Sequence, residues 1–431
     1  MEEVQINIPI PNVPLPLPLP SIYRVPKHIR DSLDKKYYEP KVVAIGPYHR
    51  EHEHLRAMEG RKDVYRKKFL QESPPTTTLE CYKGKILEME AAARACYFEK
   101  PAVPELTKDE FVEMLVLDGC FILQFFIDGF EERHCDPILA VEWMLPLLHN
   151  DLLMLDNQIP FLVLKELYDM YSVDQGRGST RQQKEPLMSM IAKYFEKALS
   201  LTITSSVDQS HEVRIDNLLH LFHCHFVTRP TVERAGDEPP LDHWPTSVPC
   251  ARELTLHGVT FRPMKERKNI LDVTFHDGKL EFPVLRIQEP DCTRYMNLIA
   301  FEMSNHQVHK HLTSYVMLMD YLIDTAEDVL ILKEHNILKN QLASAEELAD
   351  FFNQLRRCSY INYNTHYLRR VYFDVDNYCR RKWNKTKATF RRRYLSTPWA
   401  TFGFVFAILF GCFTIFSAVI SIMQTFFHLP K

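Results

Sequence analysis

The chain has 431 residues, of which 45% are hydrophobic and 25% are charged, and its formal net charge is −4. This is the composition of a globular protein long enough for a packed core and two to three domains. A net charge near zero gives no reason to expect nucleic acid as a partner. The ten cysteines contain no CxxC pair, which suits reduced thiols better than a disulfide framework.

Residues 1–21 form a proline-rich N-terminal arm, with prolines at positions 9, 11, 14, 16, 18 and 20. This spacing predicts an extended, polyproline-type segment. The arm has neither a basic start nor an uninterrupted apolar run, so we do not expect a secretory signal peptide. The main domain is predicted to cover residues 22–379.

Two short stretches carry strand patterns. The run "KVVAIGPY" (41–48) is β-like and ends at Gly46-Pro47. Residues 271–287 alternate between apolar and polar side chains on both sides of Asp277-Gly278, a pair that favours a two-residue hairpin turn. The sequence therefore predicts a small β component.

Most of the remaining domain reads as helix. Thr107 with Glu110, and Ser344 with Glu347, have the spacing of capping boxes in front of apolar stripes. The nearly continuous apolar run 151–171 predicts one buried helix, or two helices broken near Pro160. Polar, turn-rich stretches at 172–186 and 228–249 are predicted loops or linkers. The expected fold class is mainly α with a small β component (α+β).

Three carboxylates lie among apolar residues and are the candidate catalytic residues: Asp118, Asp156 and Glu302. A buried carboxylate must be paired or change its pKa, and such groups gather at functional sites. The competing interpretation is structural, with these acids capping helices or pairing with Arg and Lys. Sequence alone does not show whether they converge on one pocket.

Signatures of cofactor or metal binding are weak. The chain has no GxxxxGK[ST], GxGxxG, HExxH or GxSxG motif, and we predict no cofactor. Histidines cluster at His49, His52 and His54 and again in "HLFHCHF" (220–226), but neither cluster has a second half at a zinc-ligand spacing. These histidines are expected to be core or surface residues.

The C-terminal end differs from the rest of the chain. Residues 399–427 are long and apolar enough to predict one transmembrane helix, followed by a short tail at 428–431. The basic segment 380–398 precedes it, so the large N-terminal domain is expected on the cytosolic side of a tail-anchored protein. The length of the predicted transmembrane helix suggests that it lies in the plasma membrane. The predicted interface residues, which would contact headgroups of an anionic leaflet, are Arg391, Arg392, Arg393, Tyr394 and Trp399.

Several phrases resemble a plant family. "SIYRVPKHIR", "YYEPKVVAIGPYHRE", "LVLDGCFIL", "DLLMLDNQIPFLVL", "VPCARELTLHGVTFRP" and "TPWATFGFVFAILF" follow one another as in the DUF247, or UPF0481, proteins of unknown function. The resemblance implies a single family-wide unit, a terminal membrane span and no established activity. It also implies a possible tie to self-recognition, because some grass members are linked to self-incompatibility.

Three functions remain open at this point. The preferred hypothesis is recognition or signalling by contact with an unknown protein partner. The second is an enzyme beside a membrane, using Asp118, Asp156 and Glu302 as acids and bases. The third is a polybasic scaffold that binds an anionic lipid surface through residues 380–393.

Overall fold

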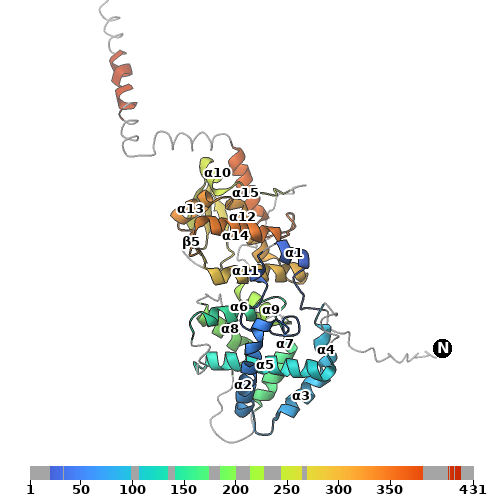
Figure 1. Ribbon diagram of the computed structural model, residues 1–431. Helices are drawn as coiled ribbons and strands as arrows, with labels where there is room; N and C mark the ends of the chain where they lie inside the picture. Colours follow the sequence, from blue (N-terminus) through green and yellow to red (C-terminus); the bar gives the residue numbers. More distant parts are fainter. Residues whose placement is uncertain are drawn as a thin grey trace, which may run out of the picture.

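The computed structural model describes residues 20–32, 34–98, 106–133, 141–173, 185–199, 214–227, 244–264, 269–381, 406, 408–411 and 413–418. Over these residues the chain is mainly helical with two small sheets, as the sequence predicts. Figure 1 shows two helical halves, one holding α2 to α9 and the other α10 to α15, with α11 at their junction. The short N-terminal helix α1 lies beside α11.

The first half is built around α5, most of whose residues are buried. Helices α2, α3, α7 and α8 all pack on it. The predicted capping box is confirmed, because Thr107 and Glu110 bond to each other's backbone at the start of α5. The helices of this half are α2 (Arg56–Glu72), α3 (Leu79–Glu88), α4 (Glu90–Ala95), α5 (Lys108–Phe130), α6 (Met144–Leu152), α7 (Phe161–Ser172), α8 (Leu187–Ala198) and α9 (Leu218–Phe226).

The second half is built around α12, which packs against α11 and α14. Its helices are α10 (Ala251–Leu256), α11 (Glu289–Ser304), α12 (His311–Leu322), α13 (Ala326–Glu334), α14 (Ala345–Arg357) and α15 (Arg369–Arg380). Its strands are β1 (Thr260–Pro263), β2 (Thr274–His276), β3 (Lys279–Phe282), β4 (Leu285–Ile287) and β5 (Leu338–Asn340). Before both halves come α1 (Lys27–Ser32) and the 3₁₀ turns η1 (Lys35–Tyr37) and η2 (Glu53–Leu55).

The predicted hairpin is confirmed. Strands β2 and β3 pair antiparallel, and the turn between them places Asp277 and Gly278 at φ values of 49° and 73°. Positive φ at both turn residues matches the right-handed twist of the strands. Strand β1 adds to β3 in parallel, and β4 pairs in parallel with β5 to make the second sheet.

The apolar run 151–171 forms two helices broken near Pro160, the second of the two arrangements that the sequence predicts. Helix α6 ends at Leu152 and α7 begins after Pro160, so the intervening residues are not helical. Of the predicted loops, 174–184 and 228–243 lie outside the described residues, as does the arm up to residue 19. Residues 244–249 are described and form no regular element.

The strand predicted at 41–48 is wrong. Residues 42–46 are buried, but the segment 41–48 forms neither helix nor strand. A strand requires a neighbouring strand to bond its amides, whereas this segment gives its N–H groups to buried side chains. We refer to residues 41–46 as the amide loop.

The predicted C-terminal transmembrane helix is also corrected. Within the described part of the chain, no helix is long and apolar enough to cross a membrane. A span needs about 20 consecutive helical residues. The longest uninterrupted described stretch between 399 and 427 runs only from Phe413 to Ala418. The other residues of that range, apart from 406 and 408–411, lie outside the described residues, as do the predicted interface residues Arg391, Arg392, Arg393, Tyr394 and Trp399.

Candidate functional site

The amide loop is held by carboxylate and amide side chains from the other elements of the first half. Asp151, at the end of α6, accepts hydrogen bonds from the backbone N–H groups of Lys41, Val42 and Val43 at 2.6 to 3.0 Å. Burial raises the pKa of Asp151 to about 6, although these three donors favour its charged form. The Asp151 carboxylate thus accepts the hydrogen bonds that a neighbouring strand would otherwise accept.

Asn157 continues the same pattern along the loop. Its Oδ1 accepts from the N–H of Ile45 at 2.7 Å, and its Nδ2 donates to the carbonyl of Val43 at 3.0 Å. The next amide, that of Gly46, donates to Asp118 Oδ2 at 2.8 Å. Gly46 has φ +72°, and a Cβ there would come within 2.4 Å of the carbonyl oxygen of Gln158. Only glycine can bring the chain this close to its neighbour.

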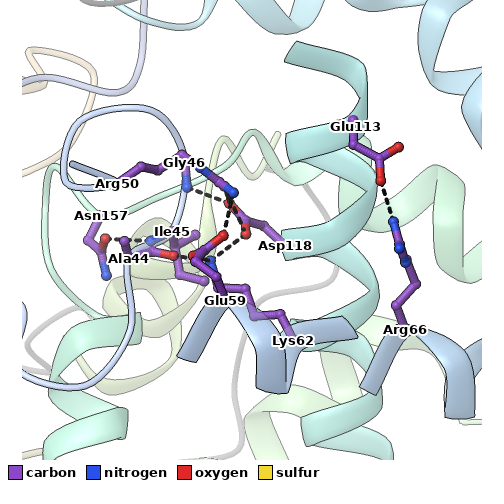
Figure 2. A network of polar contacts seen from close by, with 10 residues as sticks. All are labelled: Ala44, Ile45, Gly46, Arg50, Glu59, Lys62, Arg66, Glu113, Asp118 and Asn157. Atoms are coloured by element: carbon purple, nitrogen blue, oxygen red, sulfur yellow. Dashed lines mark hydrogen bonds and ion pairs between the residues drawn. The ribbon is translucent and has the colours of Figure 1, made fainter. Parts of the chain in front are cut away.

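Asp118 is the centre of a buried charge network, shown in Figure 2. Lys62 Nζ donates to Asp118 Oδ1 at 2.6 Å and to Glu59 Oε1 at 2.6 Å, and both Lys62 and Asp118 are fully buried. Arg50 bonds Asp118 at 3.2 Å and also pairs with Glu59. Two acids therefore face two bases, which is the condition under which charges are tolerated in a protein interior.

Asp156 anchors the N-terminal end of the chain to the same region. Its carboxylate bonds Nε2 of His49 at 2.9 Å and pairs with Arg30 of α1. Burial raises the pKa of Asp156, but the hydrogen bond from His49 and the charges of His49 and Arg30 outweigh it, so the pKa is lowered overall. Asp156 therefore stays charged and ties α1 to the segment that follows α6.

Glu302 has a different task in the second half. It lies on α11 and accepts from the N–H groups of Leu312 and Thr313 at 3.1 and 2.7 Å. It thereby caps the N-terminus of α12, whose own N-cap residue Lys310 makes no side-chain cap. Its Oε1 also bonds Nε2 of His223 in α9 at 2.8 Å, so the same carboxylate joins the two halves.

The structure brings two of the three predicted carboxylates to one region, but not to a shared pocket. Asp118 and Asp156 contact the chain between Gly46 and Arg50, whereas Glu302 contacts α9 and α12. None of the three carboxylates lines either of two surface pockets, one beside α3 and α5 and one beside α10, α12, α14 and α15. Their polar atoms are used to hold backbone segments in place.

Sequence reasoning missed several members of these networks, notably Lys62, Asp151 and Asn157. Lys62 had a detectable signal, because it continues the apolar stripe of α2 between Met58 and Tyr65. A charge on such a stripe requires a buried partner. Asp151 and Asn157 gave no comparable signal, since their partners are backbone amides about 110 residues away.

Histidines of the cluster 220–226 have hydrogen-bond partners. His220 bonds the amide of Asp216, and His223 bonds Glu302. Burial raises the pKa of Cys224, but the neighbouring His220 and His223 outweigh it and lower that pKa to about 7. Among the residues that the structure describes, no group of three or more His, Cys, Asp and Glu side chains is arranged to hold a metal ion.

Comparison with known proteins places this scaffold in a family. The family model described as DUF247, plant protein of unknown function, matches residues 22–413. The chain belongs to the DUF247 family. It is 30% identical to a UPF0481 protein of Arabidopsis thaliana, over 94% of this chain and 85% of that protein. A second UPF0481 protein of Arabidopsis thaliana is 22% identical, over 90% of this chain and 88% of the relative. No solved structure matches the chain significantly.

Proposed function

We propose that this DUF247 protein acts in recognition, by contact with another protein, rather than as a catalyst. The observation that supports this is the use of its buried carboxylates: Asp118, Asp156 and Glu302 are bonded to backbone amides and buried bases. A general acid or base must reach a substrate within hydrogen-bond distance. Recognition between cells or molecules of one plant, as in self-incompatibility, would be one form of such contact.

The contact surface that we propose is a groove between α3 and α5, with a volume of about 750 Å³. It is lined by apolar residues and by acids, namely Leu87, Leu106, Met114 and Leu117 with Glu80, Asp109, Glu110 and Glu113. Leu87 is 47% exposed, so its side chain is accessible to a partner. Gly84 lies on the same face of α3, and nothing comes within 4 Å of the position its Cβ would occupy.

The charges that line the groove favour one kind of partner. Four carboxylates line the groove, against the two bases Arg50 and Lys83. Lys83 is paired with Glu113 at 2.8 Å, and Arg50 is paired with Glu59 and Asp118, so neither base is available for an acidic partner. Glu113 is neutralised by Lys83 and Arg66, and the remaining negative charge of the groove comes mainly from Asp109 and Glu110. We therefore expect a partner segment that presents apolar residues flanked by Lys or Arg.

Site-directed photocrosslinking tests this proposal. A photoreactive phenylalanine analogue replaces Leu87 in the groove or, as the control, Val64, which is 52% exposed on α2 and does not line the groove. We expect a protein adduct at position 87 only, whose crosslinked peptide carries apolar residues next to Lys or Arg. Equal adducts at both positions, or a crosslinked peptide without basic residues, would contradict the proposal.

A further inference from the structure

A second pocket lies in the other half of the molecule, where four helices meet. It has a volume of about 440 Å³ and is lined by residues of α10, α12, α14 and α15. This size is in the range of sites that hold small ligands or a single side chain. It is independent of the groove between α3 and α5 and of the function proposed for that groove.

Asp320, in the last turn of α12, differs from the other buried carboxylates of the fold. It is 3% exposed, yet neither of its carboxylate oxygens has a hydrogen-bond partner among the described residues. Its closest base is Arg356, whose Nη1 lies 3.5 Å from Oδ2, too far for a normal hydrogen bond. A buried carboxylate without donors is costly, so its retention needs a reason.

The surroundings of Asp320 add negative charge. The pocket is also lined by Glu253, Asp324 and Asp376, against the two bases Arg252 and Arg356. Arg252 pairs with Glu327, and Asp376 pairs with Arg380 at 2.8 Å, which leaves Asp320, Glu253 and Asp324 beside Arg356. Arg356 stacks 5.4 Å from the ring centre of Tyr321 with its side chain 55% exposed. The C-terminal end of α12 contributes partial negative charge at the same point, and no basic residue occupies its last turn.

These observations indicate which kind of ligand would fit the pocket. It holds a carboxylate in need of donors, an excess of acids and an aromatic ring beside them, which together suit a cation that donates several hydrogen bonds. A metal ion fits less well, because no group of acidic side chains among the described residues is arranged as a ligand set. An organic cation requires only one carboxylate in direct contact.

We propose that this pocket binds a guanidinium or alkylammonium group, with Asp320 as its direct partner. The group could belong to a free small cation or to an arginine side chain of a protein segment. In either case two N–H donors would satisfy the two oxygens of Asp320.

Isothermal titration calorimetry of the full-length chain at pH 7.5 tests the proposal with two probes. Agmatine represents the free cation, and the blocked tripeptide Gly-Arg-Gly represents the side chain, with the same tripeptide containing citrulline as its uncharged control. We expect saturable binding of at least one charged probe with a Kd of about 1 mM or lower, and none of the citrulline peptide. Binding of agmatine alone would assign a free ligand, and preference for the peptide would assign a protein segment.

Two variants attribute the binding to this carboxylate. Asp320→Asn should weaken binding at least tenfold, whereas Asp350→Asn, an exposed acid on the same α14 that carries Arg356, should leave it unchanged. Arg356→Gln should tighten binding, because it removes the base that competes for Asp320. Circular dichroism confirms that each variant is folded. Absence of saturable binding in the wild type, or equal affinity of the wild type and Asp320→Asn, would overturn the proposal.

Discussion

Asp118 and Asp320 are both buried carboxylates on a central helix of their half of the molecule, yet their surroundings are opposite. Asp118 receives donors from Gly46, Lys62 and Arg50 and lies within a balanced set of charges. Asp320 receives no hydrogen bond from the described residues and lies among further acids. A buried charge that the fold fully satisfies stabilises the structure, whereas one left unsatisfied is a cost that a ligand can remove.

The largest effect should come from breaking the network of Asp118. Asp118→Asn leaves Lys62 buried with only Glu59 as an acidic partner, and breaking a buried pair in this way typically costs about 3–5 kcal/mol of unfolding free energy. Urea denaturation followed by circular dichroism measures the loss. A loss below about 1 kcal/mol would mean that the network does not hold the amide loop in place.

A smaller loss is expected at the cap of α12. Glu302→Gln removes the negative charge that faces the N-terminus of α12 and weakens the bond to His223, so we expect a loss of about 1–2 kcal/mol. Glu347→Gln, at the exposed start of α14, is the matched control and should lose about 0.5 kcal/mol or less. Equal losses in the same denaturation experiment would show that burial of the cap adds nothing.

These networks also show how far the sequence can lead. The mainly helical character, the hairpin at Asp277-Gly278 and the caps at Thr107 and Ser344 were predictable, because each depends on residues within a few positions of one another. The amide loop was not, because an apolar alternation such as "KVVAI" fits a strand equally well until Asp151 and Asn157 are known to receive its amides. Asp320 was missed for the same reason, since its isolation depends on where α10, α14 and α15 pack.

Substitution of Asp320 should raise the free energy of unfolding, whereas substitution of Asp118 should lower it. Burial raises the pKa of Asp320 to about 6, Arg356 lowers it and Asp324 raises it. Because the pKa of Asp320 is raised on folding, the folded chain binds this proton more tightly than the unfolded chain. The contribution of Asp320 to stability therefore falls as the pH rises from about 4 to above 6. Burial also raises the pKa of Asp151 to about 6, so the part of this pH dependence that belongs to Asp320 is the difference between the wild type and Asp320→Asn.

Asp320→Asn should therefore stabilise the protein at pH 7, by an amount on the order of 1 kcal/mol after allowance for solvent screening. The gain should disappear at pH 4, where Asp320 is protonated in the folded wild type. Thermal unfolding at both pH values measures it. A variant that is less stable than the wild type at pH 7 would show that Asp320 has donors in solution and belongs with Asp118.

The smallest effects concern the groove. Gly84→Ala adds a methyl group into open space on α3, so it should stabilise the helix by about 0.5–1 kcal/mol. Gly60→Ala on α2, also with nothing within 4 Å, should stabilise equally and is the matched control. If a partner packs on α3, only Gly84→Ala should reduce the crosslinking yield at position 87. Equal yields in the two variants would place the partner elsewhere.

The comparison of Asp118 with Asp320 is tested most directly by one measurement, the urea midpoints of Asp118→Asn and Asp320→Asn beside the wild type at pH 7. The account predicts shifts of opposite sign, with a large fall for Asp118→Asn and a rise for Asp320→Asn. Shifts of the same sign would contradict it, because the two carboxylates would then have the same role in the fold.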